Sequence, residues 1–450
     1  PLTPKSLAGD TKPICAMLGK FVHLTEKPMA ANGESVADLS RDEFAEQYRR
    51  IRRDSERICA PLAIEDYVVQ TATAISPAKW HLAHTSWFFE TFLLGPLQPD
   101  YEPFHAVYDY LFNSYYNAVG DQWPRPQRGL LSRPTVAEVY EYRAHVDGAM
   151  ERLLNAPPAS GESEVVQRTL LGLHHEQQHQ ELLLTDIKHI FALNPLRPAY
   201  RELQAPAGDS AGPLEWVTLP GGNHRIGHAG EDFAFDNETP AHRVYLDEFR
   251  IATRPVTNGE FIDFMEDGGY ANPLLWLSDG WDRVNREHWS APAYWERRGE
   301  RWWTMTLAGM RPVDREAPVC HVSFYEADAY ARWAGKRLPS EQEWEIAAGT
   351  GPVEGNFRDR DRLQPAAEAG PGLRQLFGDV WEWTASPYTA YPGYRPAAGA
   401  FGEYNGKFMC NQMVLRGGSC ASPRDHIRPT YRNFFFPHER WQFSGFRLAD

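Results

Sequence analysis

The chain has 450 residues, 42% apolar and 24% charged, a composition typical of a globular protein long enough for two domains. Its net charge of -14 argues against nucleic acid or an anionic membrane as a partner, because an acidic surface offers neither of them counter-charge. No apolar run reaches the roughly 18 residues needed to span a bilayer, and residues 1–33 show no secretory signal pattern. The five cysteines are odd in number and lack C-x-x-C spacing, which predicts free thiols and a cytoplasmic location.

The first half of the chain has a helical pattern. Ser40-x-x-Glu43 is a capping box, and Ser76-Pro77 reads as a cap followed by proline at the first helical position. The predicted helices span residues 44–58, 80–94, 135–154 and 164–191. Four long helices favour a bundle, a fold whose core often holds metal sites.

The pattern changes after a proline-rich stretch. Short aromatic runs rich in Gly, Pro and Trp follow it, with one clear helix predicted over 325–334. We therefore predict an α plus α+β protein, in which a four-helix bundle precedes an irregular α+β domain. The predicted parts are an N-terminal extension (1–35), the bundle (36–200), a linker (201–213) and the second domain (214–450).

The most informative motif lies in the last bundle helix. His175 and His179 are four residues apart, so they share one helical face and can bind one metal ion. A polar cluster in a bundle helix is costly unless it meets polar partners or a metal. His81 and His84, on the second predicted helix, are the candidates for a third ligand, and only one of them is required. Glu181, Asp186 and the nearby glutamines could orient the imidazoles from behind.

The same letters also spell the zinc-protease pattern H-E-x-x-H. The metzincin extension would need Gly and His where this chain has Leu182 and Thr185, so the protease interpretation is only a weak alternative. Three neutral imidazoles without a carboxylate leave a divalent metal positively charged and open on one side. Such a site suits a thiolate and O2 on Fe(II) better than structural zinc.

Two further segments carry candidate binding residues. Pro124 and Pro126 forbid a helix between the second and third helices, so Arg125 and Arg128 lie on a stiff loop, where they could grip a carboxylate or simply be exposed. The adjacent Tyr115 and Tyr116 could donate a proton or pack. Near the C-terminus, Asn433 precedes three phenylalanines at 434–436, which form core more often than a cradle for a quaternary ammonium group.

Together these motifs resemble a known family along nearly the whole chain. The His175–Glu181 motif with Leu82-Ala83-His84 resembles a DinB-type bundle. The second half resembles the formylglycine-generating-enzyme fold, a C-type-lectin-like domain. The motifs that carry this second resemblance are Arg337-Leu338-Pro339-Ser340-Glu341, Gly378-Asp379-Val380-Trp381-Glu382-Trp383, Arg416-Gly417-Gly418-Ser419 and Gly445-Phe446-Arg447-Leu448. The combination resembles the ergothioneine-biosynthetic sulfoxide synthases (EgtB).

That resemblance implies a non-haem Fe(II) enzyme that uses O2 to join a thiol to C2 of the hercynine imidazole and forms a sulfoxide. By position, it implies that iron is held by His84, His175 and His179. It implies hercynine contacts from Gln178, Asn433, Phe434 and Phe435, and a carboxylate site for the thiol at Arg125 and Arg128. Tyr115 and Tyr116 would supply a proton. Expected substrates are hercynine, L-cysteine (or γ-glutamylcysteine) and O2.

Departures from the family pattern favour the cysteine-using subgroup. Enzymes that use γ-glutamylcysteine place a catalytic tyrosine in the second domain, where this chain has Phe401 ahead of Tyr404, and carry Asn-Trp-Asp where it has Asn433-Phe434-Phe435. Formylglycine-generating activity is not expected, because its two cysteines would fall near Ser422 and Ile427.

Three alternatives stay open at the level of sequence. A selenoneine synthase would use a selenosugar in place of cysteine. An ovothiol-type 5-histidylcysteine sulfoxide synthase would accept unmethylated histidine, although such enzymes usually carry a methyltransferase domain. From a different class, the chain could be a non-catalytic binding module stabilised by zinc.

Overall fold

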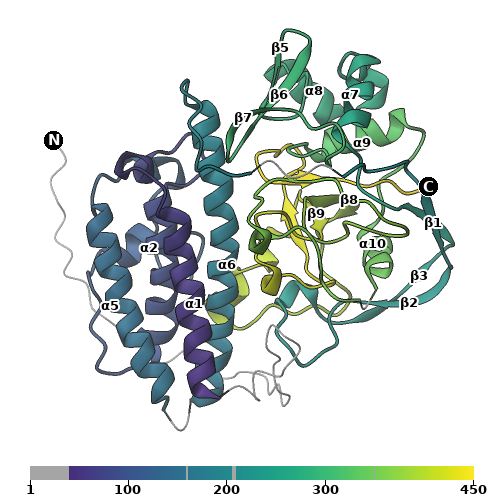
Figure 1. Ribbon diagram of the computed structural model, residues 1–450. Helices are drawn as coiled ribbons and strands as arrows, with labels where there is room; N and C mark the ends of the chain where they lie inside the picture. Colours follow the sequence, from purple (N-terminus) through teal and green to yellow (C-terminus); the bar gives the residue numbers. More distant parts are fainter. Residues whose placement is uncertain (1–39, 159–160, 205–208, 350) are drawn as a thin grey trace.

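The structure is a computed structural model that describes residues 40–158, 161–204, 209–349 and 351–450. The predicted extension at 1–35 lies outside these residues. A helical bundle and a mixed α+β part lie side by side (Figure 1), as predicted. Within the described ranges, no helix is both long enough and apolar enough to cross a membrane.

Four long helices form the bundle: α1 (Arg41–Cys59), α2 (Ala78–Phe89), α5 (Val136–Asn155) and α6 (Glu162–Leu193). Helices α1 and α2 each pack against both α5 and α6, which closes the bundle. A π-helical turn (Glu90–Leu94) and α3 (Gly95–Leu97) extend α2. Short helical segments Ile64–Val68, α4 (Tyr108–Phe112) and Arg125–Leu130 lie in the connections.

The cap signals were partly correct. Ser40 forms the predicted capping box with Glu43, and Thr135 forms a further one with Glu138 that was not predicted. The prediction for Ser76-Pro77 was wrong: Pro77 is itself the N-cap residue and Ser76 makes no cap. The Ser76 amide instead donates to Asp186 on α6, 2.8 Å away, so this turn is held by another helix.

The second part contains short strands in four small sheets. The largest has the order β10-β9-β8-β11; the others are β1-β4, β2-β3 and β5-β6-β7. The strands are β1 (Trp216–Leu219), β2 (Gly222–Ile226), β3 (His242–Leu246), β4 (Phe249–Ala252), β5 (Trp295–Arg298), β6 (Arg301–Thr306), β7 (Gly309–Pro312), β8 (Trp381–Pro387), β9 (Met413–Arg416), β10 (Asn433–Phe435) and β11 (Ser444–Gly445). Neighbouring strands are antiparallel except β8 and β11, which are parallel.

Four helices accompany these sheets: α7 (Asn258–Glu266), α8 (Ser278–Glu287), α9 (Phe324–Trp333) and α10 (Glu341–Ala348). The helix predicted over 325–334 is α9. The prediction of a single clear helix was wrong, because α7, α8 and α10 are helices of eight to ten residues, similar in length to α9.

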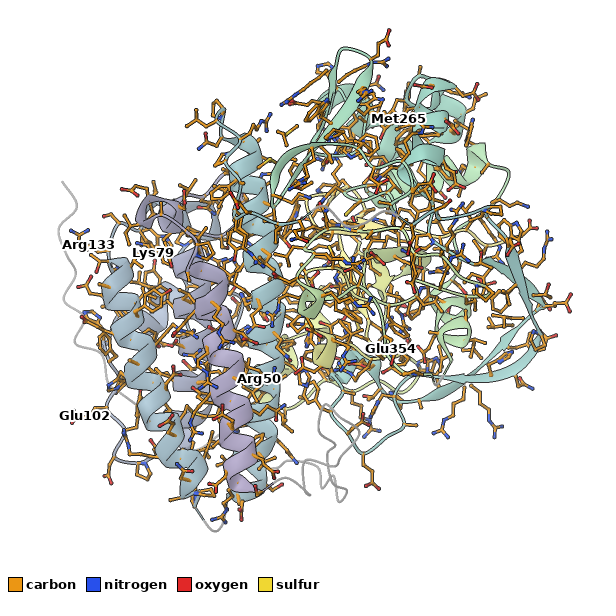
Figure 2. The ribbon with its side chains drawn as sticks, viewed as in Figure 1. Arg50, Lys79, Glu102, Arg133, Met265 and Glu354 are labelled. Carbon is orange, nitrogen blue, oxygen red and sulfur yellow. The ribbon has the colours of Figure 1, made fainter. Side chains whose placement is uncertain are left out.

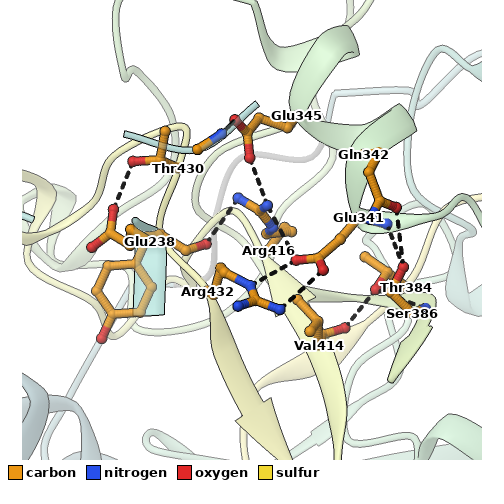
Figure 3. Close-up of polar contacts among 12 residues, drawn as sticks. Glu238, Glu341, Gln342, Glu345, Thr384, Ser386, Val414, Arg416, Thr430 and Arg432 are labelled. Carbon is orange, nitrogen blue, oxygen red and sulfur yellow. Dashed lines mark hydrogen bonds and ion pairs between the residues drawn. The ribbon is translucent and has the colours of Figure 1, made fainter. Parts of the chain in front are cut away.

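A buried ion-pair network fixes the strand that carries Asn433 (Figure 3). The Arg432 guanidinium donates to both oxygens of Glu341 on α10, at 2.9 and 3.0 Å. Arg416, at the end of β9, donates to Glu345 at 2.7 Å and to Glu341 at 3.3 Å. Removing one partner of such a network would leave a buried charge uncompensated, so β9, β10 and α10 are held in one arrangement.

Helix α6 forms the boundary between the two parts (Figure 1). Its Gln177 donates to Asp425 at 2.6 Å, and Glu181 accepts from Trp381 at 2.9 Å and from Ser422 at 2.5 Å. Arg50 on α1, labelled in Figure 2, also donates to Asp425, at 2.6 Å. These polar contacts order the two parts relative to each other.

Candidate metal centre and active site

Three buried imidazoles converge where α2 meets α6. One nitrogen each from His84, His175 and His179 lies within 4.8 Å of the other two. The rings of His84 and His175 lie edge to face with centroids 4.9 Å apart, and those of His84 and His179 are 4.7 Å apart. The close helix approach needs Gly172, because a Cβ there would lie 2.5 Å from Phe89 Cε1.

The hydrogen-bond pattern leaves ligand nitrogens free. His84 Nδ1 lies 2.6 Å from the Phe112 carbonyl oxygen, which can only accept, so Nδ1 carries the hydrogen and Nε2 holds a lone pair. That Nε2 and both nitrogens of His175 are buried without a hydrogen-bond partner among the described residues. Buried polar atoms are rarely left unpaired, so the trio fits a metal ion.

Burial also favours the neutral imidazole that a metal requires. It lowers the pKa of His175 to about 3. Burial, together with the neighbouring imidazoles, lowers the pKa of His84 and of His179 well below the usual value. At neutral pH all three rings can therefore donate a lone pair.

The glutamate of the H-E-x-x-H motif points away from this centre. Glu176 is fully buried in the bundle, where it accepts from Arg52 at 2.7 Å and from Arg143 at 3.0 Å. A metalloprotease needs this carboxylate beside the metal-bound water as general base. The protease interpretation is therefore excluded by geometry.

His175 and His179 border a cavity of about 670 Å³ between the two parts. Most of the predicted site residues line it: Tyr115, Arg125, Arg128, His175, Gln178, His179, Asn433, Phe434 and Phe435. His84 and Tyr116 lie behind that lining, buried beside His175 and Tyr115 respectively. The sequence thus identified residues from three distant segments that the fold brings to one cavity.

The two arginines differ in environment. The proline-flanked stretch forms a 3-10 helix over Arg125–Leu130, not an irregular loop. Arg125 is exposed and donates to the carbonyls of Thr73 and Ala74. Arg128 is 2% exposed, donates to two serine hydroxyls and keeps its Nε without a partner. Burial, with Arg125 nearby, lowers the pKa of Arg128 well below its usual value, and the Asp186 carboxylate only partly opposes this shift.

The tyrosine segment is braced from both parts of the protein. Asn113 accepts from the Tyr116 amide at 3.2 Å, and Glu403 of the second part accepts from the Ala118 amide at 2.7 Å. Burial raises the pKa of Tyr115 to about 12 and that of Tyr116 well above its usual value. Both side chains are therefore phenols at neutral pH and able to donate a proton.

A third tyrosine, which the sequence did not assign to the site, lies beside the metal ligands. The Tyr404 ring centroid is 5.8 Å from that of His175, and its hydroxyl donates to the side-chain oxygen of Gln178. Gln178 in turn donates to the Tyr431 hydroxyl at 2.7 Å. The sequence analysis compared the family's catalytic tyrosine with Phe401, but Phe401 packs against Phe92. Tyr404, three residues later, is the residue that reaches the site.

The C-terminal aromatic residues form one wall of the cavity. Phe434 stacks on Tyr388 with centroids 4.0 Å apart, and Phe435 packs edge-on against Trp441. The Asn433 side-chain oxygen accepts from the Phe434 amide, 2.9 Å away, so its amide nitrogen remains available to the cavity. Ring faces with a nearby amide suit a cation that also carries polar groups.

Of the two acids expected to orient the imidazoles, only Asp186 is linked to one of them, through His81. Glu181 binds Trp381, Ser419 and Ser422, and so anchors α6 to the second part. Asp186 lies 2.9 Å from a ring nitrogen of His81, whose other ring nitrogen lies 2.8 Å from His179.

Comparisons with known proteins agree with this architecture. Residues 207–370 and 368–450 match the sulfatase-modifying factor enzyme 1-like domain. The chain is 35% identical over 403 residues to the hercynine oxygenase of Mycobacterium tuberculosis, covering 83% of this chain and 91% of that one. It is 34% identical to the hercynine oxygenase of Mycolicibacterium smegmatis, with the same coverage. The formylglycine-generating enzyme of Streptomyces coelicolor is 31% identical over 56% of this chain.

A relative this similar over nearly its full length establishes the family. The resemblance noted in the sequence is thereby confirmed, with a helical bundle in front of a sulfatase-modifying-factor-like domain. His84, His175 and His179 provide a group that could hold the metal of such an enzyme. The chain therefore belongs to the hercynine oxygenase family of oxidoreductases.

Proposed function

We propose that this protein is an Fe(II)-dependent sulfoxide synthase that joins L-cysteine to C2 of the hercynine imidazole, using O2. The observation that carries the proposal is a group of three converging imidazoles, two of which line a cavity that also holds a buried arginine without an ion-pair partner among the described residues. The three imidazoles would hold Fe(II), which supplies O2 activation when bound.

The reaction balances with one O2. The C–H bond of hercynine C2 and the S–H bond of cysteine are lost and a C–S bond forms, which removes two electrons from the organic substrates. Oxidation of sulfur to the sulfoxide removes two more. O2 takes up these four electrons; one oxygen atom enters the sulfoxide and the other leaves as water.

The cavity residues would place both organic substrates. Arg128, helped by Arg125, would bind the cysteine carboxylate, because an anion there compensates a buried guanidinium. The ring faces of Phe434 and Phe435 would receive the trimethylammonium group of hercynine. Gln178 and Asn433 would contact the rest of that substrate.

The phenols beside the cavity would supply the proton that directs oxygen chemistry toward the sulfoxide. Tyr115 lines the cavity and Tyr404 approaches His175, and burial keeps both hydroxyls protonated. Tyr116 lies behind Tyr115, with the two rings stacked at a centroid distance of 4.6 Å.

A second candidate thiol, γ-glutamylcysteine, is favoured by one observation. Tyr404 comes from the second part of the protein, where users of γ-glutamylcysteine are expected to place their catalytic tyrosine, and it lies next to a metal ligand. The absence of a carboxylate at positions 434 and 435, which are both phenylalanine, argues for free cysteine.

The test is anaerobic reconstitution with Fe(II), followed by O2, hercynine and either thiol, with products identified by mass spectrometry. We expect hercynylcysteine sulfoxide, with kcat/KM higher for cysteine than for γ-glutamylcysteine. O2 consumption that does not depend on both hercynine and a thiol would overturn the proposal. A higher kcat/KM for γ-glutamylcysteine would overturn the choice of cysteine alone.

A further inference from the structure

His81 lies one helical turn before His84 and is 2% exposed. It offers no nitrogen to the three-histidine group, because both of its ring nitrogens are engaged. Nδ1 lies 2.8 Å from His179 Nδ1, and Nε2 lies 2.9 Å from Asp186 Oδ2. The result is a continuous line from a carboxylate through one imidazole to a metal-ligand imidazole.

The donors in this line follow from the chemistry of its ends. The Asp186 carboxylate can only accept, so His81 Nε2 carries the hydrogen that it donates. With its hydrogen on Nε2, His81 holds a lone pair on Nδ1 and accepts from His179 Nδ1–H. His179 is left with its lone pair on Nε2, the atom that can face His84 and His175.

The Asp186 carboxylate is fixed through one oxygen, whereas its other oxygen has no hydrogen-bond partner among the described residues. Its Oδ2 also accepts from the Ser76 amide at 2.8 Å, and its Oδ1 is buried without a hydrogen-bond partner among the described residues. A buried carboxylate with spare accepting capacity is costly unless positive charge lies nearby. The Arg128 guanidinium supplies part of that charge, and a divalent ion held by three neutral imidazoles would add to it.

We propose that the His81–Asp186 pair is a positioning device for the metal site, which fixes the tautomer of His179 and strengthens its donation to the ion. Carboxylate-to-histidine hydrogen bonds behind a metal ligand have this effect in general, and here a second histidine extends the reach of the carboxylate. The inference depends on the proposed function only in requiring that the three histidines bind a divalent metal.

Metal affinity tests the proposal directly. The wild type and the variants Asp186→Asn, His81→Leu and His81→Gln would be titrated with Co(II) against a chromophoric chelator, and the Co(II) absorption spectrum recorded. Asp186→Asn is nearly isosteric, and because the Oδ2 position accepts from both the Ser76 amide and His81 Nε2, the asparagine would place its oxygen there. The variant therefore keeps the hydrogen on His81 Nε2 and removes only the negative charge behind it.

We expect Asp186→Asn and His81→Leu to weaken Co(II) binding by about 10- to 100-fold and to change the spectrum. His81→Gln should recover part of the affinity, because its side-chain oxygen can accept from His179 Nδ1–H. Glu90→Gln is the matched control: this buried carboxylate accepts from Tyr101 and Tyr142 at the far end of the α2 segment and contacts no histidine of the site. Its Co(II) affinity should equal that of the wild type.

Wild-type affinity and spectrum in both Asp186→Asn and His81→Leu would overturn the proposal, as would equal losses in His81→Gln and His81→Leu. Thermal unfolding of the metal-free proteins checks that each variant folds, and Asp186→Asn decides the question if His81→Leu does not. Because the readout is binding, a wild type that makes no sulfoxide would refute the proposed function while leaving this inference standing.

Discussion

Arg128 lies flat against the indole of Trp80, with its guanidinium carbon 3.3 Å from the ring centroid, and forms no ion pair with any described residue. The stacked, desolvated guanidinium is oriented toward the cavity before any substrate arrives. Preorganisation of this kind lowers the entropy cost of binding an anion.

Arg128→Gln should therefore weaken thiol binding and stabilise the substrate-free protein. Loss of a charge-assisted contact of about 1.5–3 kcal/mol corresponds to a rise of about 10- to 100-fold in the KM for cysteine. Removal of an unpaired buried charge should raise the melting temperature. Arg133→Gln, at an exposed arginine of the same connection, is the control that changes charge alone. An unchanged KM would remove Arg128 from the carboxylate site.

Metal binding should stabilise the protein through the three histidines. At a free Fe(II) concentration of 100 times Kd, the gain is about 2.7 kcal/mol, measurable as a higher melting temperature under anaerobic conditions. His175→Gln should abolish this gain, because it removes one of the three imidazole ligands. In the wild type, neither ring nitrogen of His175 has a hydrogen-bond partner among the described residues. His174→Gln, next to it on α6 but stacked on Phe233, should keep the gain.

Glu176→Gln should reduce stability, not only activity. The buried Arg52 and Arg143 would each lose their ion pair with Glu176, which should lower the free energy of unfolding by about 3–5 kcal/mol. Glu162→Gln on the same helix breaks only an exposed pair with Arg41 and should cost less than about 1 kcal/mol. Chemical denaturation measures both. A stable but inactive Glu176→Gln protein would restore a catalytic role for the motif glutamate.

Substitution of Tyr115 or Tyr404 should change the ratio of sulfoxide to sulfinate, whereas substitution of a tyrosine outside the site should not. Tyr115→Phe or Tyr404→Phe should slow sulfoxide formation by about 100-fold and raise the fraction of cysteine sulfinate, because a proton donor is lost. Tyr110→Phe, at an exposed tyrosine in the preceding helix, should leave the ratio unchanged. Wild-type product ratios in both test variants would exclude these phenols as donors.

Glu439 should make the stability of the protein depend on pH. Burial raises the pKa of this cavity-lining carboxyl to about 7. The folded state therefore binds a proton that the unfolded state has released, so this residue's contribution falls as pH rises from about 4.5 to about 7. Glu439→Gln should be more stable than wild type at pH 8, by at most about 3 kcal/mol, and no more stable near pH 4. Glu354→Gln, at an exposed position, should show no such difference in chemical denaturation.

The sequence predicted the parts of the fold that depend on local chemistry. The capping box at Ser40 directly precedes α1, although the predicted helix began three residues later, at Phe44. The four-residue spacing of His175 and His179 places them on one face. Helices α7 and α10 begin with the same signal, at Thr257 and Ser340, but are too short for their periodicity to stand out.

Features that depend on contacts between residues far apart in the chain could not be predicted from local sequence patterns. Tyr404 reaches His175 only because the second part docks on α6. Asp186 is 105 residues from His81, and spacing along α6 does not reveal which acid faces the histidines. Glu181 looked equally suitable, yet its carboxylate lies on the side that meets Ser419 and Ser422.

Three faces of helix α6 make three different kinds of contact. His175 and His179 face the cavity, Glu176 and Gln180 face the bundle core, and Gln177 and Glu181 face the second part. One residue inserted before His174 would turn everything after it by about 100° relative to the preceding turns. Metal ligands, core ion pairs and docking contacts would then all exchange places at once. This helix should therefore tolerate many single substitutions on its surface but no change of length.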